Sequence, residues 1–276
     1  MKNVVIIFMA IMLVACGDNK SAKNEQEAPD AKALQSQVTE KSATTMLLHD
    51  VNEPGVEPYQ SRVIVTDNFI RLDENNDGND FVLVDRKKQI IYSVSNDNDA
   101  ILVVNRRPVD IPAPMELKLS VDKKQDTSAP QIDGKDVVHY VFKVNGAACN
   151  DAMIAEGLLM NTARALSEYR HILAGQHAST LESVPADMRN ACDMASHIFH
   201  PDRHLQYGLP VQESDYSGYK RSLADFDDDW VADPKLFVLP AEFGRFTIDE
   251  MKAPADAPAT SADGEAEKAV PVASQG

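Results

Sequence analysis

The stretch that decides the fold is RLDENNDGNDFVLVDRKKQIIYSV, residues 71–94. It matches the first, third, fifth and sixth positions of an EF-hand calcium loop with Asp73, Asn75, Asp77 and Gly78. The twelfth position, which must supply a bidentate carboxylate, is Val84, and the flanking runs are short and β-type instead of helical. Asp77-Gly78 favours a tight turn because both residues accept left-handed backbone. The stretch therefore predicts a hairpin and no calcium site.

Short apolar runs of the same kind extend from Thr45 to Val144, separated by clusters of Asn, Asp, Gly and Lys. They read RVIVTDNFIRL, DFVLVD, QIIYSV, AILVV, MELKLSV and VVHYVFKV. Because the connections are of hairpin length, the pattern predicts an antiparallel meander. In MELKLSV, the alternation of Met115, Leu117, Leu119 and Val121 indicates a sheet with one buried and one solvated face.

The hydrophobic period then changes from two to between three and four. Residues 151–174 are expected to form an amphipathic helix, with Asn150 or Asp151 as its cap and Gly175 as its stop. A second helix is expected from Pro185 to just before Pro201, and its apolar stripe holds Met188, Cys192, Ala195 and Phe199. Strands are expected to return after Gly208-Leu209-Pro210, in LPVQESDYSGYKRSLADFDDDW and KLFVLPAEFGRFTI. The predicted fold class is α+β: a curved antiparallel, half-barrel-like sheet with two helices packed on one face.

The first sixteen residues point to a cell compartment. A short positive start is followed by an apolar run from Val4 to Val14, too short to span a bilayer, and by LVAC at Leu13 to Cys16. This resembles a bacterial lipoprotein signal peptide with its lipobox, which implies removal of residues 1–15 and acylation of Cys16. Gly17 stands where an inner-membrane retention signal would have Asp, so the outer membrane is expected. The alternative is an ordinary secretory signal with an accidental Cys.

The 276-residue chain divides by composition into a domain between two polar segments. Residues 16–44 and 253–276 hold few large apolar groups, so a disordered tether and a disordered Ala/Pro/acidic tail are expected on either side of a globular domain at 45–252. The net charge of −16 argues against nucleic acid or anionic lipid headgroups as partners. Contact with the membrane is therefore expected only through the lipid on Cys16.

Two cysteines remain once Cys16 is set aside, namely Cys149 and Cys192. An even pair in an oxidising periplasm predicts a structural disulfide, with a metal site or a free buried thiol pair as alternatives. Since Cys149 precedes the first expected helix and Cys192 lies on the second, the bond would clamp the strand-to-helix corner against the second helix.

Residues suited to chemistry are few. The segment HIFHPDRH brings together His197, His200 and His204, which makes them weak candidates for a zinc or copper site, although histidines also favour helix C-termini for electrostatic reasons. The run DFDDDW, residues 225–230, is a candidate cation site or a solvated loop with Trp230 anchoring the strand end. No nucleophile motif or phosphate loop is present, so neither an enzyme nor a cofactor is predicted.

The phrases FIRLD…FVLVDRKKQIIYSV, GLPV and FVLPAEFGRF resemble a group of proteobacterial lipoproteins whose strand pattern is similar to the LolA/LolB superfamily of envelope carriers. The resemblance implies a half-barrel of strands around helices, and no ligand residue follows from it. Three functions are expected in turn: a carrier of an apolar ligand or a lipoprotein partner, an envelope interaction module with no cavity, and a cation sensor.

Overall fold

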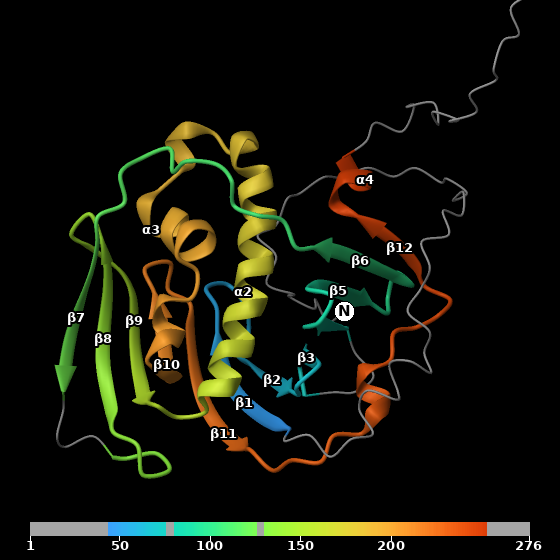
Figure 1. Cartoon of the computed structure of the whole chain (residues 1–276), viewed down its shortest axis with the longest axis horizontal. Coiled ribbons are helices and arrows are strands. Elements are labelled where there is room, and N and C mark those ends of the chain that lie inside the picture. The colour runs from blue at the N-terminus through green and yellow to red at the C-terminus, as the bar shows by residue number, and fades with distance from the viewer. Residues whose placement is uncertain (1–43, 76–79, 126–129, 253–276) are drawn as a thin grey trace, which may run out of the picture.

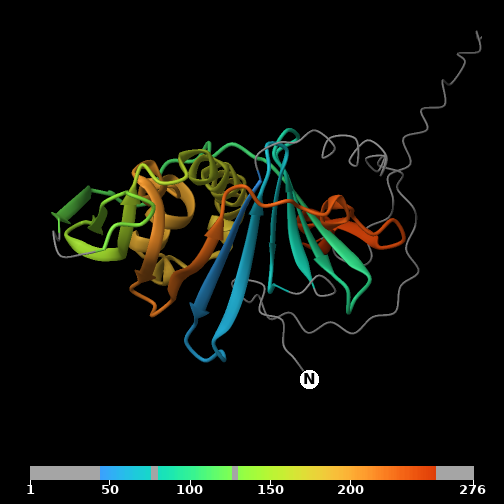
Figure 2. The same cartoon turned by 90° about the horizontal axis from the view of Figure 1, so that it is seen from below.

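The computed structural model describes residues 44–75, 80–125 and 130–252. Within them, twelve strands form one sheet in the order β12-β6-β5-β4-β3-β2-β1-β11-β10-β9-β8-β7, and each pair of neighbours is antiparallel except β12 and β6. Figures 1 and 2 show an open, curved sheet that does not close into a barrel, with α2 and α3 on one side. The α+β class with two helices packed on a curved antiparallel sheet is therefore confirmed.

The elements have the following bounds. The strands are β1 Thr45–Asn52, β2 Tyr59–Val65, β3 Phe69–Asp73, β4 Phe81–Asp85, β5 Ile90–Ser95, β6 Ala100–Asn105, β7 Leu119–Gln125, β8 Val137–Val144, β9 Ala147–Glu156, β10 Gly208–Asp215, β11 Lys220–Asp227 and β12 Gly244–Thr247. The helices are α2 Met160–Thr180, α3 Ala191–Asp193 and α4 Ile248–Lys252, with a π-helical turn η3 at Met194–Phe199 and 3₁₀ turns η1 Leu181–Ser183, η2 Ala186–Met188, η4 Arg203–Gln206 and η5 Pro234–Phe237.

The hairpin expected in the opening stretch is confirmed. β3 and β4 pair antiparallel with Asp73 opposite Phe81, so residues between them connect two adjacent strands. Asp77 and Gly78, which we expected in the turn, lie outside the described residues. The neighbouring hairpins β2–β3, β4–β5 and β5–β6 have the same local connectivity, as a meander requires.

The central strands are buried on both faces, which explains their unbroken apolar runs. Val63 and Val65 of β2 pack in one cluster with Leu166 and Ile172 of α2. On the opposite face, Ile64 packs in a second cluster with the C-terminal segment around η5. The solvated second face predicted for the sheet is therefore wrong for this part of it.

The face pattern predicted for MELKLSV is also wrong. β7 begins only at Leu119, and Met115 and Leu117 belong to the preceding connection, where they pack against helical turns. Leu119 and Val121 are 36% and 40% exposed because β7 is the last strand of the sheet among the described residues. An edge strand lacks the neighbour that would cover such side chains.

The first predicted helix was placed about nine residues too early. Residues 147–156 form β9, which pairs with both β8 and β10, so the proposed caps Asn150 and Asp151 lie within a strand. Tertiary pairing overrides local helical spacing here, since Ala152 and Ile154 alternate into a buried face. Gly175 lies inside α2 instead of ending it. A Cβ at this residue would lie 2.1 Å from the carbonyl oxygen of Arg107, so Gly175 allows the β6–β7 connection to cross the helix.

The second predicted helix is shorter and less regular than expected. A 3₁₀ turn at Ala186–Met188 comes first, and the helix proper starts at Ala191 and continues as a π-helical turn to Phe199. Met188, expected on the inward stripe, is 63% exposed, whereas Ala195 is fully buried. The strands predicted after Gly208 are confirmed as β10 and β11, but KLFVLPAEFGRFTI yields only η5 and the short β12.

The predictions for the two ends of the chain lie outside the described residues. These are the signal peptide at 1–15, Cys16, nearly all of the tether at 16–44 and the tail at 253–276. They remain predictions. No helix in the part of the chain that the structure describes is long and apolar enough to cross a membrane.

Candidate functional site

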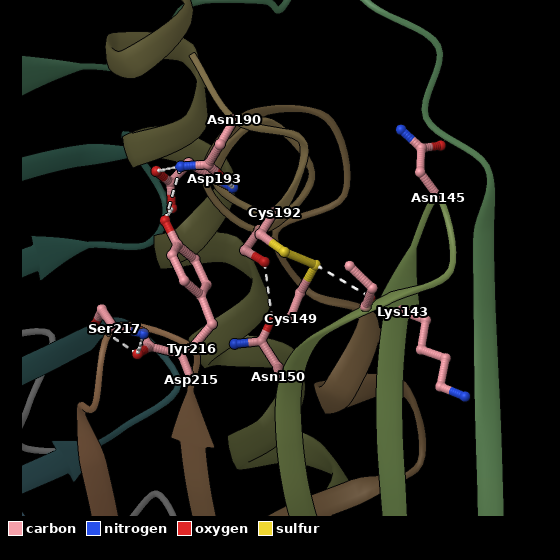
Figure 3. The surroundings of a disulfide bond; sticks show 12 residues. Lys143, Asn145, Cys149, Asn150, Asn190, Cys192, Asp193, Asp215, Tyr216 and Ser217 are labelled. Carbon is pink, nitrogen blue, oxygen red and sulfur yellow. Dashed lines mark hydrogen bonds between the residues drawn. A yellow bond between two sulfur atoms is a disulfide. The ribbon is translucent and has the colours of Figure 1, made fainter. Parts of the chain in front are cut away.

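The predicted disulfide is present and forms the centre of a rigid corner, shown in Figure 3. It joins Cys149 of β9 to Cys192 of α3, with their Cα atoms 5.2 Å apart. Cys149 lies near the start of the strand β9, and not at the entry to a helix as predicted. The bond therefore fixes the short helix directly to the sheet. Ser196 adds a second link by donating to the side-chain oxygen of Asn150 at 2.8 Å.

Tyr216, in the β10–β11 turn, is locked against the same corner. Its hydroxyl donates to Asp193 at 2.7 Å and accepts from the Asn190 amide at 2.8 Å (Figure 3). Its backbone N–H donates to the carbonyl oxygen of Cys149 at 3.2 Å. Burial and the hydrogen bond to Asp193 raise the pKa of Tyr216 to about 12, so the hydroxyl stays neutral. Nevertheless the residue is 53% exposed, which leaves a fixed aromatic side chain accessible to a partner.

Asn190 explains why a helix starts at this place. Its side-chain oxygen accepts from the backbone N–H of Asp193 at 2.8 Å, which is a standard N-cap. The cap orients the same amide group whose N–H reaches Tyr216. Asn190 and Tyr216 were not singled out in the sequence, because their contact joins segments 26 residues apart. The exposed Met188 precedes this cap by two residues, so the corner presents two large side chains.

A buried group of charged side chains lies where β1, β10, β11, α2 and η4 meet. Glu213 of β10 accepts from Arg221 of β11 at 2.9 Å, and Arg170 of α2 lies 3.9 Å from the same carboxylate oxygen. His204 of η4 has its Nε2 atom 3.7 Å from Glu213, too far for a hydrogen bond. His49 of β1 is 1% exposed, and neither of its ring nitrogens has a hydrogen-bond partner among the described residues.

This environment shifts the pKa of its ionisable groups strongly. Burial, and then the positive charge of Arg221, lowers the pKa of His49 to about 3. Burial and Arg170 lower the pKa of His204 to about 3 as well. Burial alone would raise the pKa of Glu213, but Arg221 outweighs it and the pKa falls to about 2. At neutral pH the group therefore holds two neutral imidazoles, one carboxylate and two guanidinium groups.

The three histidines proposed as metal ligands go to different places. His204 joins the buried group, whereas His197 packs edge-on against His177 of α2, with ring centroids 5.8 Å apart. His200 ends the π-helical turn. Within the described ranges, no set of three or more His, Cys, Asp or Glu side chains is arranged to hold a metal ion. The geometry therefore gives no support to the cation-sensor hypothesis.

Two acidic segments from the sequence have structural roles. Asp73, the first position of the EF-hand match, accepts from Arg62 at 2.8 Å and from Arg71 at 2.6 Å, so its carboxylate is already engaged. In the run at 225–230, β11 ends at Asp227, and Trp230 packs into the second hydrophobic cluster. The predicted anchoring role of Trp230 is confirmed.

Ser167, His171 and Asp202 lie together, but their order does not suit nucleophilic catalysis. Ser167 donates to Asp202 at 2.8 Å, and the His171 ring lies 2.9 Å from the backbone oxygen of Ser167. In a catalytic triad the histidine would accept from the serine and be oriented by the acid. The trio instead connects α2 to the loop before η4.

The space between α2 and the sheet is filled. Most residues of α2 are buried or half-buried, and the first hydrophobic cluster joins its side chains directly to those of the central strands. An open depression lies elsewhere, at the end of the β5–β6 pair, and both apolar and polar surface lines it. Apolar side chains of α2 therefore cover the face of the central strands that lies beneath the helix.

Comparison with known proteins gives little further information. No family model and no curated protein matches the chain. Among solved structures it is similar to one described as "Structure of PNGF-II in C2 space group", with 12% sequence identity and a TM-score of 0.36. The match covers 76% of this chain but only 32% of that one, so the chain spans about a third of that protein. A likeness this weak supports no argument about function.

Proposed function

We propose that this chain is a lipid-anchored lipoprotein of the bacterial outer membrane whose periplasmic domain docks a protein partner. The N-terminal pattern ending in Cys16 supports the anchor. The disulfide fits an oxidising compartment, since such bonds are rare in reducing cytosol. No catalytic step is part of the proposal.

The observation that carries the docking function is the filled interior. A carrier of apolar ligands needs a concave apolar space that can take up several hundred Å³. Here Leu166 and Ile172 of α2 occupy that position and pack against Val63, Val65 and Val84 of the sheet. A domain with a closed core and a rigid surface is better suited to binding another protein than to enclosing a lipid.

The disulfide corner is the surface best suited to such a partner. Rigid aromatic side chains are favoured at the centres of interfaces because little side-chain entropy is lost when they bind. Tyr216 satisfies this requirement, since its ring is exposed while its hydroxyl is held by two residues of the corner. The exposed Met188 adds adaptable apolar contact.

Site-specific photo-crosslinking in intact cells tests the docking surface. A photoreactive side chain at Tyr216 or Met188 should give an adduct of one discrete mass, because a specific partner contacts the corner in one geometry. Val231, which is 87% exposed, is the matched control and should give no adduct of that mass. Equal adducts at Val231 and Tyr216, or none at either, would contradict docking at the corner.

The anchor is tested separately by Cys16→Ala. Acyl chains on a processed N-terminal cysteine would hold the protein at the membrane, so the variant should lose acyl labelling and remain unprocessed or soluble. Normal membrane fractionation of the variant would disprove lipidation. A result of this kind would leave the corner intact as a docking surface.

A carrier remains the second candidate because an open curved sheet with helices on one side is the architecture that the LolA/LolB resemblance implies. It requires α2 to move off the sheet and expose the first hydrophobic cluster. Saturable binding of an apolar fluorescent dye to the purified protein, competed by lipid, would favour this candidate over the docking module.

A further inference from the structure

The strand β7 has one side of its backbone open among the described residues, because it is the last strand of the sheet (Figure 1). The N–H of Asn145 donates to the carbonyl oxygen of Lys118 at 2.9 Å, in register with the β7–β8 ladder. Hydrogen-bonded pairs alternate along antiparallel strands, so residues 120, 122 and 124 bond to β8. The N–H and C=O groups of residues 119, 121 and 123 therefore point away from β8, where they can accept a further strand.

The same edge carries apolar surface. The side chains of Leu119 and Val121 lie on one face of β7 and are 36% and 40% exposed. In the ladder they lie opposite Val144 and Phe142 of β8, which are buried, so apolar side chains continue from the core to the edge. An added strand would cover Leu119 and Val121 and remove apolar area from water.

Two cations flank this edge, and neither has a carboxylate partner within the described ranges. Arg203 of η4 lies over the Phe142 ring, 5.3 Å from its centroid, on the face of Leu119 and Val121. Its guanidinium donates to the carbonyl oxygens of Ser120 at 2.8 Å and Lys143 at 3.4 Å. Lys124 is exposed on the other face, because successive side chains of a strand alternate. An incoming strand with acidic side chains would be complementary to both cations.

A second copy of β7 does not fit this edge. Two identical strands pair antiparallel about a two-fold axis, so the register is set by the residue that faces itself. With residue 121 at the axis, Lys118 would face Lys124. With Asp122 or Lys123 at the axis, two identical charges would face each other. Like charges directly opposite each other destabilise a strand pair, and charged edge strands avoid self-pairing for this reason.

We propose that β7 receives an extended segment of a partner protein as an additional strand, with apolar side chains over Leu119 and Val121 and carboxylates beside the two cations. The open backbone groups supply hydrogen bonds that do not depend on the partner's sequence, and the side chains on either face select among strands. This inference goes beyond docking at the disulfide corner and does not rest on it.

Fluorescence polarisation with two synthetic peptides and the purified full chain tests the proposal. Both peptides are tagged octapeptides, one of alternating valine and glutamate and the other of alternating valine and lysine. The glutamate peptide should bind saturably and several-fold more tightly than the lysine peptide, because only its charge complements the edge. Lys124→Glu should reduce this preference, since it replaces one of the two cations with a carboxylate.

A matched pair of variants tests the backbone contact. Val121→Pro removes an N–H that points away from β8, so the ladder keeps its hydrogen bonds and circular dichroism should be unchanged. The variant should bind the glutamate peptide about fivefold more weakly or worse, because a hydrogen bond to the added strand is lost. Val121→Thr keeps the N–H and should bind nearly as tightly as the unchanged protein.

Equal binding of the two peptides, binding of neither, or equal binding by Val121→Pro and Val121→Thr would overturn the proposal. A dimer in sedimentation that dissociates in Val121→Pro would assign the edge to a second copy, which also overturns it. If Val121→Pro fails to fold, an unchanged preference for the glutamate peptide in Lys124→Glu would do the same. Photo-crosslinking at Tyr216 reports on the disulfide corner alone, so the two docking surfaces can fail separately.

Discussion

Acid should unfold this domain more readily than its core suggests, because His49 and His204 are buried as neutral imidazoles. In the unfolded chain their pKa returns to about 6.5, whereas in the folded protein each is about 3. Between these values the unfolded state binds protons that the folded state does not. The unfolding free energy is therefore not reduced by these two histidines above pH 6.5, and it decreases as the pH falls from 6.5 toward 3.

The magnitude follows from the two pKa values. From pH 6.5 to 4.5 each histidine is protonated only in the unfolded chain, so each removes on the order of 3 kcal/mol of unfolding free energy. The two together approach half of a typical domain stability. His177, His197 and His200 act in the same direction, since burial lowers the pKa of each. Glu213 adds a loss only below pH 4.5, where its folded pKa of about 2 begins to matter.

Urea unfolding at pH 7.5 and at pH 4.5, followed by circular dichroism, measures this difference. His49→Leu should reduce the loss between the two pH values by on the order of 3 kcal/mol, because it removes one of the two buried imidazoles. It should not destabilise the protein at pH 7.5, since it also removes two buried nitrogens that have no hydrogen-bond partner among the described residues. His171→Gln, at an exposed position on α2, is the control. An unchanged pH dependence in His49→Leu would refute this account of the buried group.

Three further results are expected. Replacing Cys149 and Cys192 together with Ala should lower the free energy of unfolding by about 4 kcal/mol, which is the loop entropy for their separation of 43 residues. The melting temperature should fall by roughly 10 °C. An unchanged melting temperature would show that the corner is held by its hydrogen bonds alone. Gly175→Ala should destabilise the domain by more than 1 kcal/mol in the same assay, because its Cβ would collide with the backbone of Arg107, and a neutral effect would mean that the crossing is looser than described. Calcium titration calorimetry should show no micromolar site, since Asp73 is held by two arginines, and a one-to-one isotherm abolished by Asp77→Ala would contradict this.

The sequence determined those features that depend on local backbone preferences or on composition. Alternation and unbroken apolar runs between turn residues identified the strands from β2 to β6, because each pairs with its neighbour in the chain. The count of cysteines gave the pairing of Cys149 with Cys192, since only two remained in an oxidising compartment. Trp230 was assigned correctly as an anchor, because a large aromatic side chain at the end of a strand favours packing against apolar neighbours.

Only the tertiary structure decided the features that depend on distant partners. Residues 150–156 have helical spacing, yet β8 and β10 on either side supply hydrogen bonds that make them a strand. Gly175 has the appearance of a helix stop, but the connection that crosses it lies almost 70 positions earlier in the chain. The buried group around Glu213 draws side chains from five elements, and Tyr216 meets Asn190 across 26 residues. No local pattern records such contacts, because their free energy arises only when the sheet has formed.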